Sequence, residues 1–300
     1  MSMSLVSFVK SRRGGNHPLE QAILHSLNLI QFQFTKGIRN VVIKPNMCYY
    51  WDPTSGQTTD PQFVAALVNV IREEVSPDVN ISIVESDASA MKCRYSFKML
   101  QYEKMARRCG VDLINLSEDE GEMVKVVSGG HPFVFKLPRT IKNADLRINV
   151  PKIKYMGKVK ITCALKNIYG CNPYPKKFKY HTKLDEAIVA LNKVMRFHLC
   201  IIDGVVVSGV EPCRLDLVMA SQDLVAIDVA AAKIAGITPR SSKHIMLAGR
   251  EGLGNLSFTP RGISPNYFAS RYPREGAVAK LTNLAVKFVK TIGLGSRLGL

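Results

Sequence analysis

The chain has 300 residues, of which 46% are hydrophobic, 22% are charged and 8% are aromatic. This composition excludes a disordered, collagen-like or low-complexity protein, and the length suits one large domain or two ordinary ones. The formal net charge is +17, from 41 Lys and Arg against 24 Asp and Glu. Such an excess of positive charge bears on the partners of a protein and not on its fold.

The positive charge is concentrated in the second half of the chain. Residues 1–150 carry 18 basic and 15 acidic side chains, whereas residues 151–300 carry 23 and 9. The segment Arg139–Lys183 holds 12 Lys and Arg and a single acid, Asp145. A run of like charge is often a solvated face, but apolar, strand-like residues interrupt this one. An anion-facing surface or pocket is therefore the favoured interpretation.

Seven cysteines are present, and no two of them have CxxC spacing. This argues against a disulfide framework and against a zinc or iron–sulfur knuckle. No signal peptide is recognisable, and no apolar run reaches the roughly 18 residues that a membrane span needs. We therefore expect a cytoplasmic protein without a transmembrane segment.

Strand-like and helix-like patterns alternate along the chain from residue 41. Short β-branched or apolar runs predict strands at 41–43, 81–84, 111–114, 146–150, 198–203 and 215–220. Helical spacing predicts helices from Pro61, where Asp60 is the expected N-cap, and over 97–109, 184–196 and 224–235. The alternation predicts an α/β fold with a mostly parallel sheet and helices on both faces.

Three stretches depart from this alternation. Met123–Leu137 is typical of a β-hairpin with its turn at residues 128–131. Residues 252–275 are rich in Gly, Pro and Arg and are expected to form an irregular loop. Residues 277–291 have the pattern of a basic amphipathic helix, which we expect to dock on the body of the protein. We accordingly divide the chain into an α/β domain, 1–254, and a C-terminal loop and helix, 255–300.

Polar residues follow four of the predicted strands. These ends are Lys44-Pro45-Asn46, Glu85-Ser86-Asp87, Asn149 to Lys154, and Asp203-Gly204. In an open α/β sheet, ligands bind beyond the carboxyl ends of the strands. Four ends that combine Lys and Asn with Asp therefore predict a binding site at this edge.

The segment Lys152–Gly170 has the highest density of lysines. It contains Lys152, Lys154, Lys158, Lys160 and Lys166, and Asn167 follows the last of them. Crowded ammonium groups lower one another's pKa, so that one could act as a base or form an imine. They also hold phosphate or carboxylate groups as point charges, which is the commoner use and the favoured one here. Tyr and Phe side chains are interleaved with them, and that mixture also suits single-stranded nucleic acid.

Other candidates are weaker. His181 precedes a predicted helix and is more often a surface or capping residue than a site residue. Asp228 lies within an apolar helix and needs a partner, either in a structural ion pair or as a site acid. No dinucleotide fingerprint, phosphate loop or serine nucleophile elbow occurs in the chain.

The strand-end motifs resemble the family known as domain of unknown function 362. The resemblance covers about Val41 to Gly254 and is carried by seven motifs together. They are Ile43-Lys44-Pro45-Asn46, Thr59-Asp60-Pro61, Glu85-Ser86-Asp87, Ile148-Asn149-Val150-Pro151-Lys152-Ile153-Lys154, Ala164-Leu165-Lys166-Asn167-Ile168-Tyr169-Gly170, Ile202-Asp203-Gly204 and Val225-Ala226-Ile227-Asp228.

The resemblance implies an α/β fold and leaves the chemistry open. Many relatives append a ferredoxin-like, cysteine-rich module, but this sequence has no such motif and no cysteine after Cys213, so electron transfer is not the expected role. Where the family often has histidine after the second lysine, this chain has Tyr155-Met156, which removes a candidate acid, base or metal ligand. It also has Glu211-Pro212 where a Gly-Pro pair is usual.

The sequence thus predicts a protein that binds a polyanionic small molecule at its strand ends. The expected anion-binding residues are Lys44, Asn46, Lys152, Lys154, Asn167 and His181, and the expected catalytic residues are Asp87, Lys166 and Asp203. Asp87 or Asp203 would act as a general base or a metal ligand. An enzyme is favoured, with neither reaction nor cofactor assigned. The alternative is an RNA- or ribosome-associated protein that uses the basic face of residues 139–183.

Overall fold

The computed structural model describes residues 3–274 except 13, 15 and 48. An eight-stranded sheet with the order β12-β1-β11-β10-β7-β2-β3-β4 forms the centre. Its strands are β1 (Ser4–Lys10), β2 (Asn40–Pro45), β3 (Asn80–Glu85), β4 (Asp112–Asn115), β7 (Leu146–Val150), β10 (Leu199–Val207), β11 (Cys213–Ser221) and β12 (Phe258–Gly262). Every neighbouring pair is parallel except the two pairs that include β11. The predicted α/β fold with a mostly parallel sheet is confirmed.

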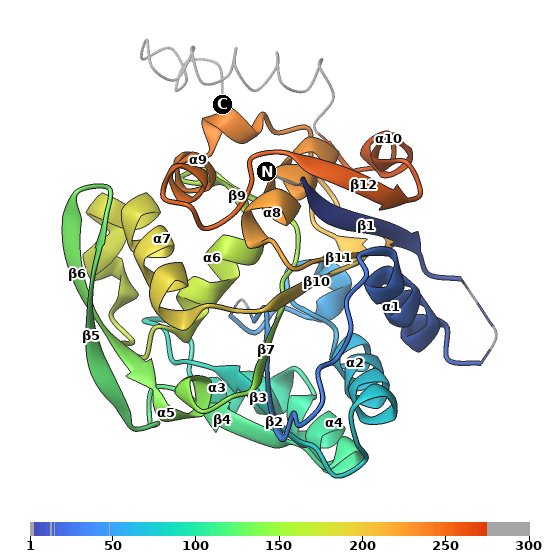
Figure 1. Ribbon diagram of the computed structural model, residues 1–300, viewed down its shortest axis with the longest axis horizontal. Helices are drawn as coiled ribbons and strands as arrows, with labels where there is room; N and C mark the ends of the chain where they lie inside the picture. The colour runs from blue at the N-terminus through green and yellow to red at the C-terminus, as the bar shows by residue number, and fades with distance from the viewer. Residues whose placement is uncertain (1–2, 13, 15, 48, 275–300) are drawn as a thin grey trace, which may run out of the picture.

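Helices cover both faces of the sheet, and each face has its own hydrophobic core (Figure 1). One core is formed with α1 (Pro18–Leu29), α2 (Pro61–Glu74), α3 (Cys93–Met99) and α4 (Tyr102–Cys109). The other is formed with α6 (Ala164–Ile168), α7 (Leu184–Met195), α8 (Leu224–Ile234), α9 (Lys243–Arg250) and α10 (Pro265–Ala269). Val41, Val42 and Ile43 of β2 are almost fully buried, as expected of a strand with helices on both sides.

Local sequence signals explain where several helices begin. Asp60 caps α2 by accepting a hydrogen bond from the Gln62 N–H, and Pro61 takes the first helical position. The single helix expected over 97–109 is instead two, α3 and α4. They are divided at Gln101, whose φ of 64° interrupts the helical hydrogen bonds. Next to the break, the buried Tyr102 hydroxyl donates to the Thr59 carbonyl, 2.8 Å away.

The predicted hairpin is confirmed as β5 (Gly121–Ser128) and β6 (His131–Pro138). It stands beside α7 at the left of Figure 1, and α5 (Arg139–Lys142) follows it. A second, shorter hairpin, β8 (Lys154–Met156) with β9 (Lys160–Thr162), occupies the lysine-rich segment and was not expected. The 3₁₀ helices η1 (Pro53–Ser55), η2 (Tyr169–Cys171), η3 (Lys177–Lys183) and η4 (Pro239–Ser241) complete the described elements.

The prediction of an irregular loop over 252–275 is partly wrong, because this segment contains a strand and a short helix. β12 lies within it and pairs in parallel with β1 at the edge of the main sheet, and α10 follows. Short strands with Pro and Gly, such as β12, carry little periodicity, so the pattern does not reveal them. The domain boundary at residue 254 stays a prediction, and the basic helix expected at 277–291 lies outside the described residues. No helix in the described part of the chain is long and apolar enough to cross a membrane.

Candidate functional site at the carboxyl edge of the sheet

The strand order places a switch point between β2 and β7. From β2 the chain continues to β3 and β4 on one side, whereas β7 and β10 lie on the other side. Lys44 pairs with Asn149 and Pro45 with Val150, so the two strands end side by side. A switch point of this kind is where open α/β sheets bind ligands. The strand-end residues predicted from the sequence are therefore brought to one edge.

Lys44 is completely buried at this edge. Its Nζ lies 2.8 Å from Glu85 Oε2 and 2.6 Å from the Pro45 carbonyl oxygen. Gly170 packs against the same ammonium group, since a Cβ there would lie 2.9 Å from Lys44 Nζ. The positive charge of Lys44 is thus neutralised within the protein.

A second buried ion pair joins the ends of β7 and β10. Lys152 Nζ lies 3.0 Å from Asp203 Oδ2, and each side chain is only 1% exposed. Asp203 also accepts hydrogen bonds from the backbone N–H groups of Asp60 and Val205. The Asp203 carboxylate is therefore fully engaged and holds the start of α2 against β10. We call these two, Lys44–Glu85 and Lys152–Asp203, the inner ion pairs.

Amide side chains lie between the inner ion pairs. Asn167 Nδ2 donates to Asn149 Oδ1 at 2.7 Å and to the Lys44 carbonyl at 3.2 Å, and Asn149 Nδ2 donates to the Ala164 carbonyl. Asn46 behaves differently, because its buried Oδ1 has no hydrogen-bond partner among the described residues. Thr58 Oγ1 in the same loop shares this property. An unsatisfied buried acceptor is costly, so these two atoms mark a place for an additional polar group.

The remaining predicted residues have internal contacts as well. Lys154 Nζ donates to the Gln57 carbonyl at 3.0 Å. Asp87 accepts from Lys92 Nζ at 2.7 Å and from the Cys93 N–H at 2.9 Å. Burial works to raise the pKa of Asp87, but these hydrogen bonds outweigh it and hold the pKa below its usual range. Asp87 thus holds the first N–H group of α3, at Cys93, and is ionised at neutral pH.

Asp228 fixes the short helix α6, which carries Lys166 and Asn167. Its two carboxylate oxygens accept hydrogen bonds from the N–H groups of Ala164 at 2.6 Å and Leu165 at 3.0 Å. Burial raises the pKa of Asp228 to about 6. Asp228 thus contacts backbone N–H groups of α6, and not the lysine of the ion pair considered from the sequence; its role as a site acid stays a prediction.

A group of basic residues lies outward of the inner ion pairs. Partial burial, and after it the positive charges of Lys158 and Lys166, lower the pKa of His181. Lys166 Nζ lies 4.9 Å from the centre of the Tyr169 ring, which in turn packs 6.5 Å from Tyr180, the residue before His181. The charges of Lys158 in the β8–β9 turn and of Lys166 in α6 thus act on the imidazole of His181 in η3. We call Lys158, Lys166 and His181 the outer cation cluster.

Two residues of the site were given no role from the sequence, although Glu85 belongs to one of the predicted strand ends. Glu85 is the partner of Lys44, and Lys177 Nζ lies 2.6 Å from Ser86 Oγ. Burial lowers the pKa of Lys177, and the charge of Lys44 adds to the effect although Glu85 opposes it. Glu85 could have been found as the only acid that β3 carries into its carboxyl end. Lys177 had no signal of its own, because it is one of three lysines within residues 176–179.

The site is built from cations, amides and buried carboxylates. No group of three or more His, Cys, Asp or Glu that could hold a metal ion occurs in the described ranges. The roles predicted for Lys44, Asn46, Asp87, Lys152, Lys154, Lys166, Asn167, His181 and Asp203 stay predictions, although the structure brings these residues to one edge of the sheet.

One protein family matches most of this chain. The pattern of the family "Domain of unknown function (DUF362)" matches residues 41–233, which span β2 to α8. The chain belongs to this family. The matched region contains the inner ion pairs, the outer cation cluster and Asp228. β1, which pairs with β11 and β12, lies outside it.

Two further proteins are similar to parts of the chain. A thylakoid-associated protein of Synechocystis sp. is 28% identical over 154 residues, which are 47% of this chain and 46% of that protein. The chain therefore matches about half the length of this curated relative. The solved structure of the lactate racemase apoprotein from Thermoanaerobacterium thermosaccharolyticum has a TM-score of 0.47 and 12% sequence identity, covering 78% of this chain and 57% of that chain.

Proposed function

We propose that this protein binds a phosphorylated or carboxylated small molecule at the carboxyl edge of its sheet and acts on it as an enzyme. The observation that carries the proposal is the outer cation cluster, in which the charges of Lys158 and Lys166 act on His181 although the three residues belong to separate segments. Cations converging at a strand-end switch point form an anion site at the position where this class of fold binds its ligands.

The distribution of acids supports the proposal. Residues 146–183 contain ten Lys and Arg and no Asp or Glu. The one acid of the longer basic segment, Asp145, lies before β7 at the opposite edge, where it accepts hydrogen bonds from the N–H groups of Arg39 and Asn40. Two carboxylates that end neighbouring strands, Glu85 and Asp203, are buried and paired with Lys44 and Lys152.

The two layers of lysines are assigned different roles in this proposal. Lys44 with Glu85 and Lys152 with Asp203 form a neutral scaffold that fixes the strand ends. Lys166 and His181, together with Lys158, face the anion, while Asn46 supplies the unsatisfied acceptor for a hydroxyl or protonated group of the ligand. Lys177, whose pKa is lowered by burial, is the candidate proton acceptor. The cysteines that the structure describes are free, which favours the cytoplasm as the compartment.

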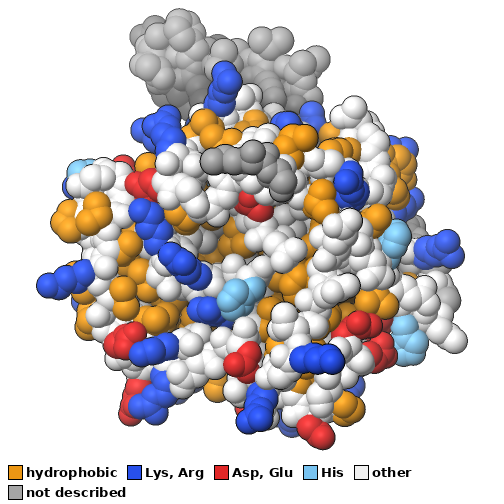
Figure 2. All heavy atoms as spheres, in the orientation of Figure 1, with side chains coloured by type: hydrophobic (Ala, Val, Ile, Leu, Met, Phe, Trp, Pro, Cys, Tyr) orange, Lys and Arg blue, Asp and Glu red, His pale blue; other side chains and the backbone are white. Residues whose placement is uncertain are grey.

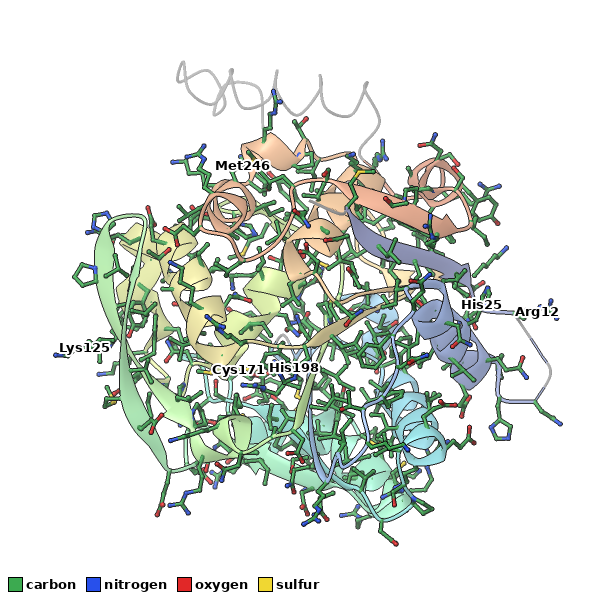
Figure 3. All side chains as sticks on the ribbon, in the orientation of Figure 1. Arg12, His25, Lys125, Cys171, His198 and Met246 are labelled. Atoms are coloured by element: carbon green, nitrogen blue, oxygen red, sulfur yellow. The ribbon has the colours of Figure 1, made fainter. Side chains whose placement is uncertain are left out.

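A titration calorimetry experiment with tripolyphosphate and citrate tests this function. Lys166→Ala should weaken binding by about 10- to 100-fold, since a charge-assisted contact contributes about 1.5–3 kcal/mol. The matched control is Lys125→Ala, an exposed lysine of the β5–β6 hairpin that projects from the left of the molecule in Figure 3. An equal loss in both variants, or no binding of either anion to the wild type, would contradict the proposal.

RNA binding is the second candidate, and one observation favours it. The Phe178 side chain is 57% exposed between the exposed cations Lys176 and Lys179 of the η3 region. If a single strand binds there, the logarithm of its affinity falls with the logarithm of salt concentration by about 0.7 per phosphate contact. A filter-binding titration of oligouridylate over increasing salt measures this slope, and the absence of binding at low salt removes RNA as a candidate.

A further inference from the structure

Exposed aromatic side chains gather in the segments that follow the carboxyl ends of β2, β3 and β7. After β7 they lie in the same segments of the chain as the outer cation cluster, and after β2 they belong to the loop that contains Asn46. The residues and exposed fractions are Tyr49 48%, Trp51 50%, Tyr95 45%, Tyr155 65%, Tyr174 36% and Phe178 57%. Large aromatic rings are costly to leave in water, so a concentration of them at one edge marks a binding surface.

Hydrogen bonds join these segments into one rim. The Lys154 ammonium of β8 donates to Gln57 in the loop after β2. Ser96 of α3 donates to the Tyr49 carbonyl. The loop after η2 is held by Ser89, which donates to the Pro175 carbonyl. The aromatic rings are thus carried by loops that contact one another, and not by unrelated parts of the surface.

Two of the rings are the best placed to contact a ligand on the outer cation cluster. Tyr155 belongs to the same short hairpin as Lys158, and Phe178 to the same 3₁₀ helix as His181. They are also the two most exposed aromatic side chains of the rim. Other rings of the rim already have contacts, because Lys179 Nζ covers Tyr174 at 4.6 Å from the ring centre, and Tyr49 packs 5.7 Å from Trp51.

From this juxtaposition we infer that the ligand is a nucleoside polyphosphate, with its phosphates on the outer cation cluster and its base against Tyr155 and Phe178. The inference rests on the proposed anion-binding function and names the class of ligand. A planar base stacks on an exposed ring whatever its hydrogen-bonding edge, and cations beside the ring hold the phosphates. A small anion without a ring, such as citrate, would leave both aromatic side chains uncovered.

The test compares ATP, UTP and tripolyphosphate by titration calorimetry against the full chain, with divalent cations chelated. The base adds stacking to the phosphate contacts, so we expect both nucleotides to bind about 10-fold or more tightly than tripolyphosphate. Tyr155→Ala and Phe178→Ala should each reduce this difference while leaving tripolyphosphate affinity unchanged. Lys166→Ala should weaken all three ligands. Tyr267→Ala is the matched control, because it removes a ring of α10 that contacts Lys10 and Arg271, and it should change none of the affinities.

The outcomes separate the two proposals. Equal affinity for the nucleotides and tripolyphosphate, with Lys166→Ala still weakening both, overturns the nucleotide assignment and keeps the anion site. No binding of any of the three overturns both. Binding of oligouridylate without binding of ATP or UTP also overturns the nucleotide assignment, because the rim would then serve a polymer. Thermal melts of each variant confirm that loss of binding is not loss of folding.

Discussion

The inner ion pairs and the outer cation cluster use the same residue type for opposite purposes. The side chains of Lys44 and Lys152 are no more than 1% exposed, and each lies against a carboxylate. Lys158 is exposed and acts electrostatically on His181 together with Lys166. Each inner lysine forms a neutral pair with its carboxylate and contributes to the fold, whereas the charges of Lys158 and Lys166 act on an exposed histidine. Sequence position alone does not separate them, since Lys152 and Lys158 are six residues apart.

At the opposite edge of the sheet, charged side chains are arranged in a third way. Figure 2 shows this edge, where Lys and Arg side chains alternate with Asp and Glu over the lower half of the face, and His198 lies near the middle of the same view in Figure 3. Arg139 pairs with Glu120 there, and Lys142 with Glu122. Charges of both signs therefore intermix on that face, whereas residues 146–183 at the carboxyl edge carry ten Lys and Arg and no Asp or Glu.

Breaking an inner ion pair should have the largest effect on stability. Lys152→Met leaves the buried Asp203 carboxylate without its partner, and the free energy of unfolding should fall by about 3–5 kcal/mol. The control is Lys142→Met, which breaks a pair whose side chains are both 51% exposed and should cost no more than about 1 kcal/mol. Urea denaturation measures both. Similar losses for the two variants would contradict the assignment of Lys152 to the scaffold.

The pH dependence of stability should report on Asp228, the residue that fixes α6. Burial raises its pKa to about 6 in the folded protein, from 3.8 when unfolded, so the folded state favours the protonated form. The stabilisation is complete below pH 3.8 and is lost as the pH rises through about 6, a change on the order of 1–3 kcal/mol. Urea denaturation of the wild type and of Asp228→Asn should therefore give a stability difference that declines over this range. A flat difference would contradict the buried carboxylate as its source.

Removing an outer cation should change stability least. Lys158→Ala removes an exposed side chain, and the free energy of unfolding should stay within about 0.5 kcal/mol of the wild type. The affinity for tripolyphosphate should nevertheless fall, because the cluster loses one of its charges. Urea denaturation and titration calorimetry on the same protein preparation give both values. A loss of stability comparable to that of Lys152→Met would show that the two groups of lysines are not distinct.

The sequence predicted the centre of the fold better than its edges. Val41 to Ile43 is a continuous apolar run and Ile81 to Val84 is apolar except at Ser82, and they form the parallel strands β2 and β3. β12 and the β8–β9 hairpin have mixed composition and depend on pairing partners distant in the sequence or on tight turns, so a periodic pattern does not identify them. The break between α3 and α4 depends on one backbone conformation at Gln101, which a glutamine does not signal.

For the site, the sequence predicted its position at the strand ends but did not predict which lysines are buried against carboxylates. The strand-end residues Lys44, Asn149 and Asp203 meet at one edge because the strands are parallel, which periodicity alone indicates. Whether a lysine is buried against a carboxylate depends on which strands become neighbours. Lys152 meets Asp203 because β10 lies next to β7, although the two residues are 51 positions apart. Strand order is a tertiary property, so the partners could not be read from either segment.

The most direct test of the outer cation cluster is the pKa of the His181 imidazole, measured by NMR with and without tripolyphosphate and assigned with His181→Gln. The neighbouring lysines and partial burial lower this pKa in the free protein. An anion bound among the cations would favour the imidazolium, so the pKa of His181 should rise on binding. His198 is the internal control, because burial and Arg147 lower its pKa too, at the opposite edge of the sheet. A rise confined to His181 is the predicted result; an unchanged His181, or equal rises at both histidines, would contradict an anion site at the outer cation cluster.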